Sequence, residues 1–140
     1  MKTSSKRAMS RYHSKRSEQA IQQFCVNWFN NRYPKFRGLL CYNLNNSKNK
    51  VTGAINQSLG LVKGRSDLVF YYCSKAYMIE LKTDRGRQTA EQKQWQSQIE
   101  SFGFEYYIIR SEEDFMRLIN RIIWEHSPLE SKLNPDINKF

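Results

Sequence analysis

The spacing of apolar residues alternates along the chain between the period of a helix and that of a strand. Helical spacing predicts helices over 18–32, 90–102 and 112–124, each preceded by a residue that can cap it, namely Ser17, Thr89 and Ser111. Runs rich in β-branched and aromatic residues predict strands over 38–44, 67–73, 76–82 and 104–110. The segment 45–65 follows neither pattern, so we predict a long loop there, which in a small domain is usually functional or mobile.

This order of elements predicts an α/β fold with a mixed four-stranded sheet flanked by helices. The chain has 140 residues, enough for one compact domain, which we place at 17–126. Residues 1–16 are polar, basic and aperiodic, and we expect a flexible arm. Residues 127–140 contain two prolines and are predicted to be a frayed tail.

The net charge of +10 is distributed unevenly, which changes the functional picture. Residues 1–50 hold 11 Lys and Arg but a single acid, Glu18, whereas the rest of the chain is balanced. This asymmetry favours a polyanionic partner such as nucleic acid, although a solvated basic tail gives the same count. The three unpaired-looking cysteines, the lack of a secretory signal and the lack of an apolar run of about 20 residues predict a cytoplasmic protein without a membrane span.

Three charged residues, Asp67, Glu80 and Lys82, stand at the ends of two adjacent apolar runs. If the hairpin turns at Ser74 and Lys75, Asp67 lies opposite Lys82 and diagonal to Glu80, with all three on one face of the sheet. A register change of one residue would place Asp67 on the other face. A cross-strand ion pair at a sheet end explains the same pattern without any catalysis.

Two carboxylates with a backbone carbonyl suit Mg²⁺ or Mn²⁺ better than zinc. Neither histidine is spaced from a cysteine as the ligands of a zinc site are. The chain also lacks a phosphate-binding GxxxxGK[ST] loop. A metal site of this kind together with an ammonium is suited to metal-assisted cleavage of a phosphodiester.

The same residues resemble a known signature. Gly64-Arg-Ser-Asp67-Leu68, Glu80-Leu-Lys82 and Gly86-Arg-Gln-Thr-Ala-Glu-Gln92 are similar in order to the motifs of the VRR-NUC branch of the PD-(D/E)XK nucleases. The resemblance covers about residues 17–123 and implies a restriction-endonuclease-like αβββαβ core. Ser66 stands where the superfamily name has Pro, a position that mainly shapes the start of the strand.

The resemblance also implies roles. Asp67 and Glu80 would bind the metal together with the carbonyl of Leu81, and Lys82 would orient the attacking water or stabilise the developing charge. Glu18 would hold a water on the metal or a second metal, unless it only complements the helix dipole. Gln92 would hydrogen-bond Lys82 or the water, unless it is an ordinary exposed helix residue.

The resemblance implies a metal-dependent DNA endonuclease that is selective for branched DNA such as four-way junctions or flaps and that can act as a homodimer. The main alternative is a DNA-binding module that keeps the fold without cleavage. The candidates for DNA contacts are basic or polar residues near the predicted site or in the basic first third: Lys35, Arg37, Asn45, Lys48, Lys50, Lys63, Arg65, Arg85 and Arg87. Ordinary solvated charge accounts equally well for any single one of them.

Overall fold

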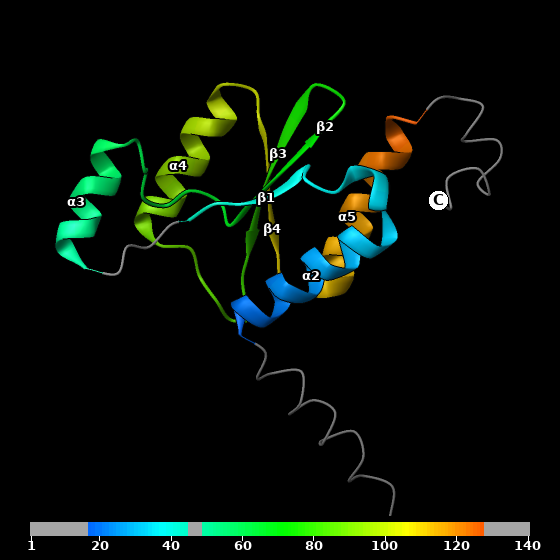
Figure 1. The fold of residues 1–140 in the computed structure, drawn as a ribbon, viewed down its shortest axis with the longest axis horizontal. Coiled ribbons are helices and arrows are strands. Elements are labelled where there is room, and N and C mark those ends of the chain that lie inside the picture. The colour runs from blue at the N-terminus through cyan, green and yellow to red at the C-terminus, as the bar shows by residue number, and fades with distance from the viewer. Residues whose placement is uncertain (1–16, 45–48, 128–140) are drawn as a thin grey trace, which may run out of the picture.

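The computed structural model describes residues 17–44 and 49–127, and Figure 1 shows their arrangement. The helices are α2 (Glu18–Arg32), the 3₁₀ turn η1 (Pro34–Phe36), α3 (Lys50–Ser58), α4 (Ala90–Ser101) and α5 (Glu112–Glu125). The strands are β1 (Leu40–Tyr42), β2 (Leu68–Tyr72), β3 (Lys75–Leu81) and β4 (Glu105–Ile109). The predicted arm and all of the predicted tail except Ser127 lie outside the described residues.

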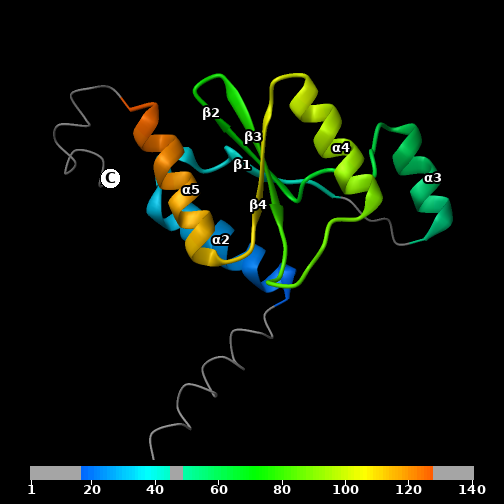
Figure 2. The same cartoon turned by 180° about the vertical axis from the view of Figure 1, so that it is seen from behind.

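The four strands form one mixed sheet in the order β1-β2-β3-β4. β1, β2 and β3 pair antiparallel, and β4 joins β3 in parallel through the α4 crossover. Helices α2 and α5 cover one face of the sheet and α4 lies on the other, with α3 beyond it, as Figures 1 and 2 show from opposite sides. The predicted α/β class and mixed four-stranded sheet are confirmed.

The hydrophobic core lies between the sheet and the α2–α5 pair. Its fully buried members include Phe29 of α2, Phe70 of β2 and Phe115 of α5. The capping residues predicted from the sequence are confirmed, because the hydroxyls of Ser17 and Ser111 accept hydrogen bonds from backbone N–H groups three residues on. This local pattern fixes where α2 begins, and α2 carries Glu18 in its first turn.

The predicted loop 45–65 is wrong in part, because it contains helix α3. The side chain of Asn49 caps this helix by accepting from the backbone N–H of Thr52. Its apolar residues Val51 and Ile55, and Leu59 at its C-cap, are all more than half exposed. These residues recur every four positions, as in a helix, but Gly53 and the Asn and Ser residues around them favour a loop.

The predicted hairpin register is also wrong, by two residues. The turn residues are Cys73 and Ser74, with φ of 48° and 64°, and Tyr72 pairs with Lys75. Continuing one step beyond the pair Leu68–Ile79 places Asp67 opposite Glu80 rather than opposite Lys82. Two successive positive φ values are those of a two-residue turn that matches the twist of the strands. Since side chains alternate with period two, the shared face of the three charged residues is unchanged.

Among the described residues, no helix combines the length and the apolar character needed to cross a membrane.

Candidate active site

Glu80 and Lys82 meet at the end of β3, in surroundings that normally exclude charge. Glu80 is completely buried and Lys82 is 6% exposed. The ammonium of Lys82 lies 3.4 Å from Oε1 of Glu80. Each buried charge thus offsets part of the other's desolvation cost, which is several kcal/mol per ion when a buried charge is unpaired.

Asp67, the residue before β2, is fixed against the same end of β3. Its Oδ2 accepts a hydrogen bond of 2.7 Å from the backbone N–H of Leu81. In a strand the N–H and C=O of one residue point to the same side, so the Leu81 carbonyl also lies on the Asp67 side of β3. The residue predicted to offer a backbone ligand therefore borders the pair of carboxylates.

The electrostatics of the site disfavour two ionised carboxylates side by side. Burial raises the pKa of Asp67 from 3.8 to about 6, the Leu81 N–H opposes this rise, and the neighbouring charges of Glu80 and Glu18 add to it. Lys82 lowers this pKa to a smaller extent. The site thus has more negative charge than its single ammonium compensates.

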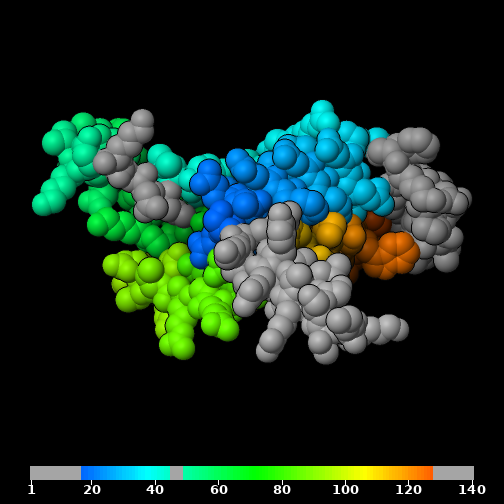
Figure 3. Space-filling model, turned by 90° about the horizontal axis from the view of Figure 1, so that it is seen from below, coloured from blue at the N-terminus to red at the C-terminus, as the bar shows by residue number. Residues whose placement is uncertain are grey.

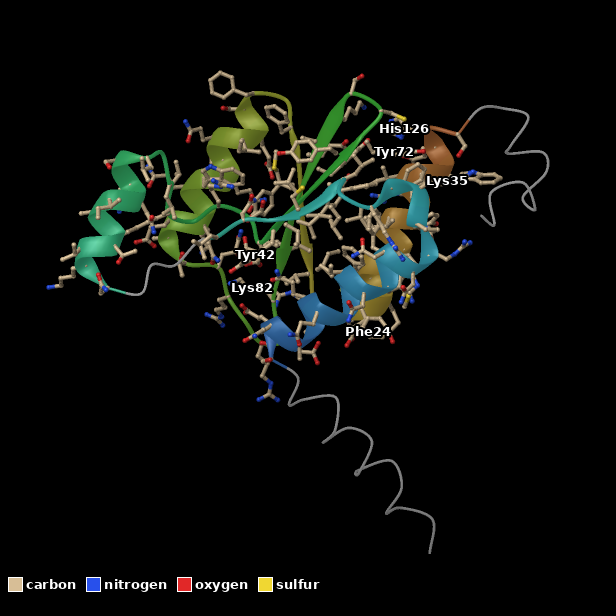
Figure 4. All side chains as sticks on the ribbon, viewed as in Figure 1. Phe24, Lys35, Tyr42, Tyr72, Lys82 and His126 are labelled. Carbon is tan, nitrogen blue, oxygen red and sulfur yellow. The ribbon has the colours of Figure 1, made fainter. Side chains whose placement is uncertain are left out.

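Glu18 reaches the site from the first turn of α2. Its Oε1 lies 3.8 Å from Nζ of Lys82, and its side chain is 44% exposed. A Cβ at Gly86 would lie 3.3 Å from the same Oε1, so the turn after β3 packs closely beside this carboxylate. Figure 4 shows Lys82 next to the start of α2 at this end of the sheet. The sequence-predicted carboxylate is therefore brought to the site.

Two residues that the sequence analysis missed hold the second oxygen of Glu80. The hydroxyl of Tyr106 on β4 donates to Oε2, and Nε2 of Gln88 lies 3.3 Å from the same oxygen. Burial, followed by the hydrogen bond to Glu80, raises the pKa of Tyr106, which keeps its hydroxyl protonated as a donor. The parallel pairing of β3 with β4, which brings Tyr106 here, has no local mark in the sequence.

Gln92, predicted to contact Lys82 or a water, has a different bond in the structure. Its Oε1 accepts from the backbone N–H of Thr89, and the Thr89 hydroxyl accepts from the Gln92 N–H in return. This reciprocal capping box starts α4. Gln92 still lines the cleft described next, but the amide that contacts Glu80 belongs to Gln88.

An open cleft of about 860 Å³ leads to Asp67. Its walls come from α3, the loop before β2 and the first turn of α4, and Glu18 closes one end. Three of the predicted DNA-binding residues line it: Lys50, Lys63 and Arg65. In Figure 3 the start of α2 lies beside the turn that precedes α4, and α3 lies at the left end of the molecule, opposite α5.

Gly64 gives the cleft its shape by joining the loop before β2 to α4. It has a φ of +80°, and a Cβ there would lie 2.4 Å from the backbone carbonyl of Glu91. Only glycine fits both the conformation and the space. This contact fixes the backbone that leads into Asp67 three residues later.

The other candidates for DNA contacts are more scattered. Arg85 and Arg87 are exposed on the turn after β3, which Arg110 fastens by donating to the carbonyls of Thr83 and Gly86. Lys35 lies at the opposite end of α2 from Lys82, as Figure 4 shows, and the Arg37 guanidinium donates to the Asn30 carbonyl nearby. The structure therefore does not bring Lys35 and Arg37 to the cleft. Asn45 and Lys48 lie outside the described residues.

The residues present fit a cation bound by few protein ligands. Within residues 17–44 and 49–127, no group of three or more His, Cys, Asp or Glu side chains is placed to hold a metal. Oε1 of Glu80, however, is buried without a hydrogen-bond partner among these residues. An unsatisfied buried carboxylate oxygen beside a second carboxylate and a backbone carbonyl suits Mg²⁺ or Mn²⁺, which keep several waters.

Comparison with known proteins shows a likeness in structure. A solved structure described as a "VRR_NUC domain protein" superimposes with a TM-score of 0.62 at 19% sequence identity. The match covers 77% of this chain and 88% of that one. This chain shares the fold of that protein. No family model matches the sequence, and no curated protein matches it either.

Proposed function

We propose that this protein is a VRR-NUC nuclease of the PD-(D/E)XK superfamily, which hydrolyses phosphodiester bonds of DNA with Mg²⁺ or Mn²⁺. The observation that carries the proposal is the buried Glu80–Lys82 pair beside Asp67, with one carboxylate oxygen left unsatisfied. Core positions on a strand rarely hold charges, and a second carboxylate beside the buried pair adds negative charge that a structural ion pair does not need. The VRR_NUC fold supports the same proposal independently.

Each site residue has a chemical role in this proposal. Asp67, Oε1 of Glu80 and the Leu81 carbonyl would hold the cation, which when bound polarises a phosphoryl oxygen and makes the attacking water more acidic. Lys82 orients that water and stabilises the negative charge that develops on the phosphorus oxygens. Glu18, 3.8 Å from Lys82, would hold a water on the cation or a second cation at the outer edge of the site.

The cleft supplies the contacts for a DNA backbone. Lys50, Lys63 and Arg65 line it, and Arg85 and Arg87 lie exposed on the adjacent turn. Positive side chains that flank a carboxylate pair neutralise phosphates on both sides of the scissile bond. Selectivity for branched DNA and action as a homodimer rest on the family resemblance alone.

The proposal is tested by cleavage of a DNA panel with the purified full chain. Linear duplex, single strand, 5′ flap and four-way junction are each incubated with Mg²⁺, Mn²⁺ or EDTA. We expect cleavage that requires the metal and is lost in Glu80→Gln and Lys82→Met. Glu105→Gln, which changes an exposed carboxylate of the same sheet, is the matched control and should cut like the wild type.

The panel also separates the alternative function. DNA binding without cleavage under every metal condition would replace the nuclease with a non-catalytic binding module. Cleavage that persists in Glu80→Gln would show that the metal site lies elsewhere. The rates on the four DNAs, together with the mass of the protein in solution, test the branched-DNA preference and the homodimer.

A further inference from the structure

The two oxygens of the Glu80 carboxylate have different surroundings. Oε2 accepts from the Tyr106 hydroxyl and lies 3.3 Å from Nε2 of Gln88, whereas Oε1 has the ion-pair contact with the Lys82 ammonium at 3.4 Å and no hydrogen bond among the described residues. A carboxylate free to rotate would present either oxygen to a ligand. Here the donors on Oε2 fix the rotation and leave Oε1 directed at the site.

The sheet register explains why Tyr106 can reach this carboxylate. Tyr106 pairs with Met78, and Glu80 pairs with Ile108. Tyr106 is therefore the diagonal neighbour of Glu80 on the same face of the sheet, within reach of a long aromatic side chain. Its neighbour Tyr107 points to the other face, where its hydroxyl donates to Glu105 over 2.8 Å.

Tyr106 is itself held in place from helix α4. Its ring packs edge-on against the indole of Trp95, with ring centroids 6.1 Å apart. Nε2 of Gln88 lies 3.5 Å from the Tyr106 hydroxyl and 2.9 Å from Oε1 of Gln96, and Gln96 in turn donates to Glu100. These side chains connect α4 to Glu80 across the face of the sheet that α4 covers.

We propose that Tyr106, supported by Gln88, is a positioning residue that sets the metal affinity of the site by holding Glu80 in a one-oxygen binding orientation. The inference rests on the proposed function, because it concerns the same cation. Hydrogen bonds to a ligating carboxylate orient it, and their loss typically weakens metal binding about 10–100-fold. Tyr106 touches Glu80 and not the reacting atoms, so its loss should act through the metal.

The test measures binding of Mn²⁺ to the full chain without DNA, by the loss of the free-ion signal in electron paramagnetic resonance. Tyr106→Phe removes the hydroxyl and keeps the ring against Trp95. We expect about 10-fold weaker Mn²⁺ binding in this variant. Half-maximal cleavage should need a similarly higher Mn²⁺ concentration, while the rate at saturating Mn²⁺ stays within a few-fold of the wild type. Tyr107→Phe is the control and should bind Mn²⁺ like the wild type.

A second variant covers the case in which Tyr106→Phe does not fold, as judged by circular dichroism. Gln88→Met keeps the length of the side chain but removes both N–H donors of the Gln88 amide, and it should also weaken Mn²⁺ binding. Wild-type affinity in the folded variants, alongside metal-dependent cleavage by the wild type, would overturn this inference and leave the nuclease intact. A wild type that binds no Mn²⁺ and cuts no DNA would overturn both.

Discussion

Replacing Asp67 with Asn should stabilise the metal-free protein at neutral pH while abolishing cleavage. Burial and the nearby charge of Glu80 raise the pKa of the Asp67 carboxyl to about 6. Its ionised form is therefore costly in the folded state. Asn keeps an oxygen that can accept from the Leu81 N–H and removes the charge, so the variant loses the ligand but not the hydrogen bond.

The size and pH dependence of this effect follow from the two pKa values. A rise from 3.8 to about 6 corresponds to about 3 kcal/mol at 1.36 kcal/mol per pH unit. Because the carboxyl is partly open to the cleft, solvent screening reduces this to about 1–2 kcal/mol. Well below pH 3.8 the carboxyl is protonated in both states and costs nothing. The cost grows between 3.8 and about 6, where only the unfolded state is largely ionised, and levels off above that range. The gain in Asp67→Asn should therefore be small near pH 4 and complete by about pH 7.

Urea unfolding in EDTA at pH 4, 5.5 and 7.5 measures this difference directly. Adding Mg²⁺ at pH 7.5 should then stabilise the wild type and leave Asp67→Asn almost unchanged, because a ligand that binds only the folded state stabilises it. A variant less stable than the wild type at pH 7.5, or a stability difference that does not vary with pH, would refute the argument that ionisation of Asp67 destabilises the folded state.

Three further predictions concern other parts of the site. Lys82→Met should lower the free energy of unfolding by about 3 kcal/mol in urea, because it leaves a buried carboxylate unpaired; unchanged stability would mean that the pair is not formed. Gly64→Ala should lower the free energy of unfolding by about 2–3 kcal/mol, through backbone strain and collision of the new Cβ with Glu91. Gly60→Ala, at a φ of +101° but in open space, should lower it by only about 1 kcal/mol. Equal losses in the two variants would exclude the collision. Lys63→Ala with Arg65→Ala should reduce the slope of log K against log salt for duplex binding by up to about 2, and an unchanged slope would remove both from the DNA interface.

Local sequence patterns were sufficient for much of the fold because they act over a few residues. The hydroxyls of Ser17 and Ser111 cap the helices that follow them, and the helix bounds agree within a residue. Helix α3 was missed because Gly53 and the surrounding Asn and Ser residues favour a loop, although Val51, Ile55 and Leu59 have helical spacing. The hairpin register was missed because Cys73 and Ser74 adopt positive φ without the Asn or Gly that usually indicates such a turn.

The candidate site could be predicted in part for the same physical reason. The alternation of side chains puts Asp67, Glu80 and Lys82 on one face whether the register shifts by two residues or not. The partner of Glu80 on β4, Tyr106, is 26 residues away in the sequence and reaches it only through a parallel strand pairing. Net charge, likewise, does not reveal which lysines face the cleft, and Lys35 lies at the other end of α2.

The places where this fold violates ordinary rules of burial coincide with one another. Glu80 occupies a core position on β3, where Tyr106 and Gln88 hold Oε2. The Lys82 ammonium lies 3.4 Å from Oε1, which has no hydrogen bond among the described residues. Asp67 is fastened by one oxygen, and its charge is disfavoured by burial and by Glu80. Both carboxylates lack compensating positive charge, and Asp67 lines the cleft that Lys50, Lys63 and Arg65 also line. An ion pair selected only for stability would gain from neutralising these deficits internally, whereas a site that leaves them open gains from a cation and a phosphate that arrive together.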